Sequence, residues 1–239
     1  MKAIFSLFII ISSIWAWVGE ISALKGDATI IRDKKSIVAK IKLKLEKDDI
    51  IKTTKNTKMQ IIFKDNTVIT IGKNSEVKIT DYIFDNENSK ANFKLSHGIM
   101  KTLTGKIGKF APKRFKVLTK NASIGIRGTY FVVESDNNFV KVGMISGITI
   151  FTNLDNMKTY EIKKGEELIF NLKQPDKIII KKGFSEPKEI KITPKENEIE
   201  KVTDTIDIQE SKNSEHIIKN SNSKSSTFTK FLEGLKDLF

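Results

Sequence analysis

Short apolar segments separated by turn residues recur about every ten residues between positions 18 and 182, and this spacing constrains the fold more than any other feature. A clear example is residues 59–63, followed by the turn 64–67 and then residues 68–72. No long segment in this region has helical periodicity. The pattern predicts an all-β domain over residues 17–182, with many short antiparallel strands forming a β-sandwich or a short β-roll.

Local patterns add four expectations. Residues 21–24 and 28–31 should pair as a first hairpin, and residues 139–144 and 148–151 should pair across a turn at Ser146 and Gly147. Residues 37–45 alternate apolar and charged side chains, which predicts one half-buried strand. Residues 104–109 contain two glycines and are expected to form a mobile surface loop.

Composition excludes several kinds of site. The chain has 42 basic and 29 acidic residues and a formal net charge of +13. It contains no cysteine and two histidines, His97 and His216, which argues against cysteine catalysis and a histidine-rich metal site. Asp48, Asp49 and Asp65 are too sparse for a calcium loop and are interpreted as turn formers. No catalytic residue, metal ligand or cofactor site is predicted.

The first residues resemble an export signal. Lys2 precedes an uncharged apolar run to Val18, which is shorter than a typical spanning helix, and Ala16 offers a small residue for cleavage. Residues 1–16 are therefore predicted to be a cleaved signal peptide, which places the protein in the periplasm or outside the cell and leaves no transmembrane span. The alternative is an uncleaved N-terminal anchor.

The C-terminal part changes in character. Residues 183–227 are predicted to be a flexible polar linker, because they are rich in lysine, glutamate, asparagine and serine. Residues 228–239 predict a short amphipathic helix that could bind a partner or the β domain. Its apolar face consists of Phe228, Phe231, Leu232, Leu235, Leu238 and Phe239.

Residues 123–133 form the most distinctive segment. Arg127 lies between Gly125 and Gly128, and a run of aromatic and β-branched residues follows. The favoured interpretation is a structural corner in which the guanidinium donates to loop carbonyls, while the alternative is a contact with a ligand or partner. Lys113, Arg114 and Lys116 lie just before this segment and are further candidate contacts for an anionic partner.

The order of several elements resembles the FecR-type domain, a family named after a periplasmic regulator of iron-dicitrate uptake. The resemblance covers about residues 19–150. Its main pieces are residues 48–53, residues 61–71 with Asn66 where glycine is usual, residues 95–100, and residues 115–133. It implies an all-β periplasmic module without catalytic residues. The namesake regulators carry a sigma-binding segment and a membrane helix before this domain, and here only the signal is expected before it.

These features lead to two functional hypotheses. The first is a non-enzymatic, exported binding or scaffold module of the envelope, whose partner is a protein, an anionic glycan or a lipid headgroup. Nucleic acid is not expected, because the basic region lacks the aromatic pattern of single-strand binders. The second is a periplasmic signalling regulator, related to iron-uptake sensing and held in the membrane by an uncleaved N-terminus.

Overall fold

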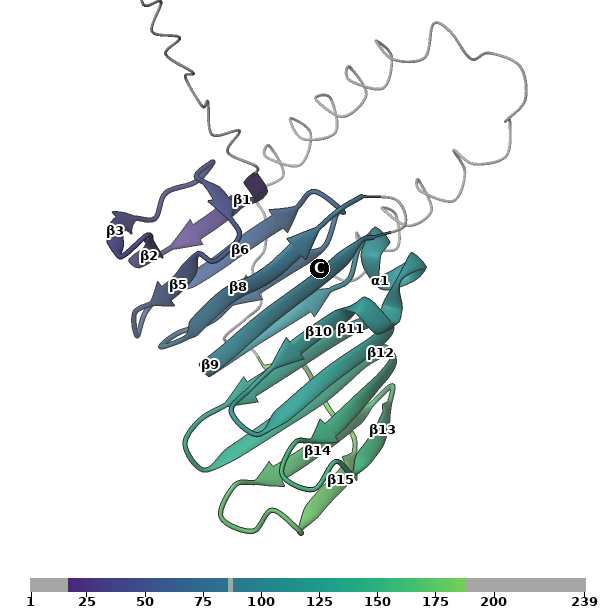
Figure 1. The fold of residues 1–239 in the computed structure, drawn as a ribbon. Coiled ribbons are helices and arrows are strands. Elements are labelled where there is room, and N and C mark those ends of the chain that lie inside the picture. Colours follow the sequence, from purple (N-terminus) through teal and green to yellow (C-terminus); the bar gives the residue numbers. More distant parts are fainter. Residues whose placement is uncertain (1–16, 86–87, 188–239) are drawn as a thin grey trace, which may run out of the picture. The chain divides into compact units, whose positions relative to one another are not determined.

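The computed structural model describes residues 17–85 and 88–187 (Figure 1). The predictions on residues 1–16, on the helix 228–239 and on the linker beyond residue 187 lie outside this part of the chain. The elements are β1 (Trp17–Lys25), β2 (Ala28–Arg32), β3 (Lys35–Val38), β4 (Lys44–Glu46), β5 (Ile50–Thr53), β6 (Lys58–Phe63), β7 (Val68–Ile71), β8 (Glu76–Ile83), β9 (Lys90–Leu103), α1 (Lys106–Phe110), a 3-10 turn η1 (Pro112–Arg114), β10 (Phe115–Leu118), β11 (Ala122–Ser135), β12 (Phe139–Asn153), β13 (Thr159–Lys163), β14 (Glu166–Asn171) and β15 (Ile178–Lys182). The all-β prediction is confirmed.

The strands form one continuous sheet that folds over into two layers. Layer A has the order β4, β1, β6, β7, the C-terminal half of β9, the C-terminal half of β11, the N-terminal half of β12, β14 and β15. Layer B has the order β3, β2, β5, β8, the N-terminal half of β9, β10, the N-terminal half of β11, the C-terminal half of β12 and β13. The three long strands β9, β11 and β12 therefore belong to both layers and hold them together.

Each long strand bends at a glycine. Gly98 in β9, Gly128 in β11 and Gly147 in β12 have φ angles of +97°, +60° and +83°, a region that side chains with a Cβ rarely adopt. A Cβ on Gly98 would lie 2.4 Å from Cα of Ser75, so this bend also requires close backbone approach. The glycines therefore determine where each strand passes from one layer to the other.

The core lies between the layers and is lined by one face of nearly every strand. Phe63 of layer A contacts Phe93 of layer B, with ring centroids 5.1 Å apart, and Phe151 and Phe170 meet across the layers at 5.5 Å. All four rings are almost fully buried. These aromatic contacts stabilise the packing of layer A against layer B.

Asp65 links the β6–β7 turn to α1. Its buried carboxylate accepts hydrogen bonds from the Tyr82 hydroxyl at 2.9 Å, from the hydroxyl and backbone N–H of Thr67, and from the backbone N–H of Ile107 at 3.1 Å. Asn66 has a φ of +64°, which asparagine tolerates better than most residues, so it can occupy a position where the resemblance leads us to expect glycine. The aspartate is thus a structural hub as well as a turn former.

Three local predictions are wrong. β1 pairs with β4 and β6 whereas β2 pairs with β3 and β5, so the turn at Gly26 connects the two layers and does not close a hairpin. Residues 37–45 are split into β3 and β4 by a turn in which Lys42 has a φ of +67°. Residues 139–153 are one bent strand, because Gly147 forms a bend and not a hairpin turn.

The connection between β9 and β10 also differs from expectation. Residues 106–110 form the short helix α1, with Ile107 buried, where a mobile loop is predicted. α1 and η1 carry the chain back along β9, so that β10 runs parallel to the N-terminal half of β9 in layer B. The sequence pattern predicts antiparallel strands. This crossover puts the basic residues of η1 next to β11.

Candidate functional site

The outer side of layer B brings Lys116 and Arg127 close together. Lys116 of β10 pairs with Gly125 of β11, and Arg127 lies two residues further along β11 on the same side of the sheet. Both side chains are exposed. Because neighbouring strands lie about 4.8 Å apart, the two cations share one surface.

The register adds Lys94, which the sequence pattern does not identify. Lys94 of β9 pairs with Leu118 of β10 in the parallel ladder and is exposed on the same side of layer B. No side-chain hydrogen bond or ion pair joins Lys94, Lys116 or Arg127 to any residue within 17–85 and 88–187. We call these three residues the basic face.

Lys113 and Arg114 border the basic face from η1. Both are exposed, and Arg114 interacts with another part of the chain. Phe110, at the end of α1, is 81% exposed and lies three residues before Lys113. The border of the basic face therefore combines cations with an exposed aromatic ring.

The acidic residues near the basic face are already paired. Glu76 of β8 contacts Lys52 at 2.9 Å, and Glu161 of β13 lies 3.6 Å from Lys163. The hydrogen bond from Lys52 is the main reason why the pKa of Glu76 is lowered. The positive charge of the basic face is therefore not cancelled by these neighbours.

Arg127 does not have the structural role expected from its sequence context. The corner is built by its neighbours, since the Thr129 backbone N–H donates to the Thr104 hydroxyl at 3.0 Å and the Thr104 N–H donates to the Thr129 carbonyl at 3.0 Å. Gly128 supplies the left-handed backbone conformation. The Arg127 side chain is exposed and donates to none of the carbonyls in the described chain, so the expectation of a corner-fixing arginine is not met.

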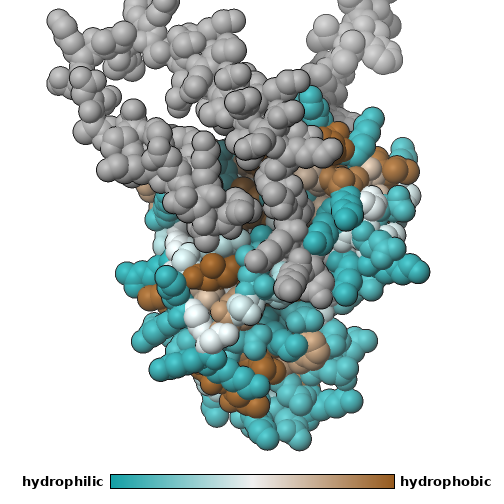
Figure 2. Space-filling view, turned by 180° about the vertical axis from the view of Figure 1, so that it is seen from behind, coloured by the Kyte–Doolittle hydropathy of each residue, from teal (hydrophilic) through white to brown (hydrophobic). Residues whose placement is uncertain are grey.

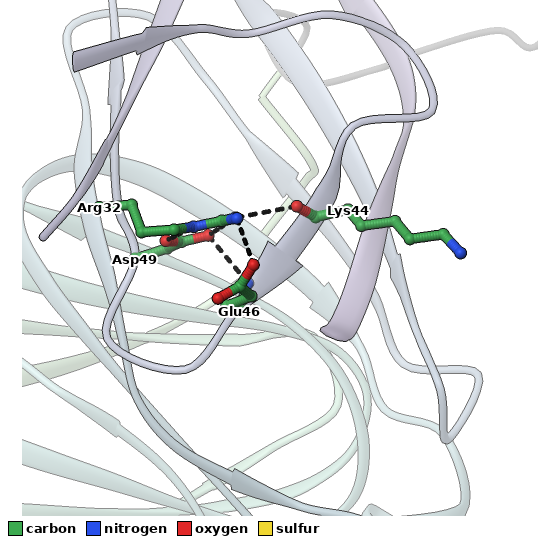
Figure 3. Close-up of polar contacts among 4 residues, drawn as sticks. All are labelled: Arg32, Lys44, Glu46 and Asp49. Atoms are coloured by element: carbon green, nitrogen blue, oxygen red, sulfur yellow. Dashed lines mark hydrogen bonds and ion pairs between the residues drawn. The ribbon is translucent and has the colours of Figure 1, made fainter. Parts of the chain in front are cut away.

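A second arginine does have a structural role. Arg32 donates to both carboxylate oxygens of Asp49, at 2.8 and 2.7 Å, to the carboxylate of Glu46 and to the Lys44 carbonyl at 2.9 Å (Figure 3). The pKa of Arg32 is raised, chiefly by its hydrogen bond to Asp49. Its donors are used within the fold, so this cluster joins the ends of β2 and β4 and leaves little capacity for a ligand.

The described chain offers neither a metal cluster nor a spanning helix. Within residues 17–85 and 88–187, no group of three or more histidine, cysteine or acidic residues is close enough to hold a metal ion. His97 is exposed on β9. No helix in this part of the chain is both long and apolar enough to cross a membrane.

One side of the molecule has a surface of mixed character. Figure 2 shows the side opposite to that of Figure 1, where small hydrophobic areas lie among hydrophilic side chains on the part not drawn in grey. Such a surface offers small apolar spots bordered by charge.

Of the comparisons with known proteins, the match to a family model agrees with the sequence resemblance. No curated protein matches the chain significantly. Two crystal structures of a candidate anti-sigma factor from Parabacteroides distasonis ATCC 8503 align with 16% identity and a TM-score of 0.47, over 56% of this chain and 59% of theirs. The chain thus spans 59% of the length of those solved chains. Residues 49–148 match the family model described as FecR protein, and this part of the chain is therefore a FecR domain.

Proposed function

We propose that this chain is a non-enzymatic, exported envelope protein whose FecR domain binds anionic groups of an envelope glycan or lipid through the basic face. The observation that carries the proposal is the position of Lys94, Lys116 and Arg127 on three adjacent strands, without an acidic partner in the described chain. In the register Lys94 and Arg127 each lie one strand and two residues from Lys116, so these like charges repel one another, and a bound anion relieves that repulsion.

The surroundings of the basic face support the same function. Gly125 and Gly128 leave the space beside the cations unoccupied, because a Cβ at either position would meet almost no other atom. A phosphate or carboxylate can therefore approach the Arg127 guanidinium without moving a side chain. Phe110 at the border adds an exposed ring that can lie against a sugar or an acyl chain.

The test compares two variants with the same change in charge. Lys94→Glu, Lys116→Glu and Arg127→Glu together reverse the basic face, and Lys35→Glu, Lys55→Glu and Lys73→Glu together change three exposed lysines elsewhere. Retention is measured at low salt on vesicles with and without anionic lipid, and on an immobilised anionic polysaccharide. The first variant should lose retention on one of the two anionic materials, and the control variant should keep most of it. Equal retention of both variants would contradict the proposal, whereas the material that distinguishes them identifies the ligand as lipid or glycan.

One observation favours the second candidate, a membrane-anchored regulator. β1 begins at Trp17, near the end of the apolar run, and the Trp17 ring lies under the ammonium groups of Lys44 and Lys64 at 4.7 and 4.4 Å. Tryptophan and lysine are the residues that favour a membrane–water interface. N-terminal sequencing of the exported protein separates the candidates, because a start at Trp17 supports release and a start at Met1 supports the anchor.

A further inference from the structure

The outer side of layer A carries a site of a different kind. After β15 the chain turns back, and the backbone N–H groups of Gly183 and Phe184 both donate to the Gly165 carbonyl, at 2.8 and 2.9 Å. The Phe184 side chain then lies on Gly143 of β12 and packs with Ile99, Val132 and Ile145. This small apolar cluster is separate from the main core.

Gly143 makes room for the aromatic ring. A Cβ at this position would lie 2.1 Å from Cε2 of Phe184, so any larger residue would displace the ring. Gly143 does not have a positive φ, and the backbone therefore does not require glycine here. Glycine weakens the middle of a strand, so we infer that Gly143 is present because it leaves room for the Phe184 ring on the outer side of layer A.

A charged residue lies beside this apolar cluster. Lys101 Nζ contacts the Glu186 carboxylate at 2.7 Å, with the two side chains only 9% and 18% exposed. The same ammonium group lies 5.6 Å from the centroid of the Tyr130 ring. A lysine this buried needs a carboxylate, because an unpaired buried charge is strongly unfavourable.

The segment that fills the site, residues 184–187, is held by few contacts. Beyond Phe184, residues 185–187 make no backbone hydrogen bond to the described chain, so side chains hold them. One partly buried phenylalanine and one ion pair are the side-chain contacts that hold this segment. A segment held by so few contacts is expected to open locally in a minor population.

We propose that Ile99, Lys101, Tyr130, Val132, Gly143 and Ile145 form a recognition site for an extended peptide with an aromatic residue two positions before a carboxylate. The chain's own Phe184 and Glu186 show the chemistry that fits, and they occupy the site until a partner segment of the same type replaces them. This site lies on layer A and the basic face on layer B, so peptide binding here does not depend on the proposed function.

The test uses the full chain and a labelled peptide with the sequence of residues 182–187. Phe184→Ala combined with Glu186→Gln vacates the site without altering layer A. This vacated variant should bind the peptide at least about tenfold more tightly than the wild type, because the chain's own segment no longer competes. Peptides in which Phe184 is replaced by alanine or Glu186 by glutamine should not bind.

A further substitution locates the binding. Lys101→Met in the vacated variant should abolish peptide binding, whereas Lys141→Met should leave it unchanged, since Lys141 lies on the same side of layer A and pairs with Glu134. Thermal unfolding checks that each variant folds. The proposal is overturned if the vacated variant fails to bind millimolar peptide, if the wild type binds equally well, or if the altered peptides bind as the parent does. The peptide comparison decides the matter even if Lys101→Met does not fold.

Discussion

The carbonyl oxygen of Gly128 lies 2.3 Å from the position that a Cβ would occupy on Gly147. The bends of β11 and β12 are thus packed directly against each other, and both depend on the absence of a side chain. The corner within residues 123–133, so distinctive in the sequence, is where two strands pass together from one layer to the other.

Gly147→Ala should therefore destabilise the domain by about 2 kcal/mol or more, from backbone crowding and an unfavourable φ together. Gly165→Ala is the matched control, since Gly165 has a φ of +78° but no neighbouring atom within 4 Å of the position that a Cβ would occupy. Chemical denaturation should show a clearly smaller loss for the control. Equal losses would mean that crowding between the bends is unimportant.

Tyr82→Phe should cost about 1–2 kcal/mol, because the Asp65 carboxylate loses a buried hydrogen-bond donor. Burial, together with the nearby Asp65, raises the pKa of Tyr82, so its hydroxyl stays protonated throughout the stable range of pH. Tyr160→Phe is the control, since the Tyr160 hydroxyl has no hydrogen-bond partner in the described chain. If both variants unfold at the same denaturant concentration, the hub at Asp65 is not important for stability.

Arg32→Lys should destabilise the domain by about 1–3 kcal/mol, because lysine cannot make the two parallel hydrogen bonds to the buried Asp49. Arg127→Lys makes the same chemical change at an exposed position and should be nearly neutral. Thermal unfolding of the two variants provides the comparison. If Arg32→Lys does not change the thermal stability, the cluster of Figure 3 orients the chain without adding to the stability of the domain.

Acid should remove a small part of the stability. The pKa of Glu76 is lowered in the fold, chiefly by its hydrogen bond to Lys52, so its contribution is present above the unfolded pKa of about 4.3 and is lost as pH falls through the lower folded value. The pair is partly exposed, which limits the effect to about 0.5 kcal/mol. Wild type and Glu76→Gln should differ in unfolding free energy at pH 7 and converge in acid, once the pH is below the lowered pKa of Glu76. A difference that persists in acid would contradict this assignment.

The sequence predicts the strands well because a strand with one buried side shows a period of two in its side chains. It does not distinguish a turn from a bend, which is why the pattern around Gly147 predicts a hairpin where one bent strand runs through. The sequence also does not show which strands pair, since β1 and β2 are adjacent in the chain but lie in different layers.

The candidate sites show the same limit. Charge indicates Lys113, Arg114 and Lys116, and the flanking glycines indicate Arg127, but Lys94 joins them only through the parallel pairing of β9 with β10. Composition places Phe184 at the start of a flexible linker, and its contact with Gly143 depends on a return of the chain after β15 that no local pattern shows.

The central claim is that Arg127 is a contact residue of the basic face and not a support of the corner next to it. The most direct measurement is the melting temperature of Arg127→Ala together with its retention, at low salt, on the anionic material identified for the wild type. The account predicts an unchanged melting temperature and weaker retention. A lower melting temperature with unchanged retention would contradict it.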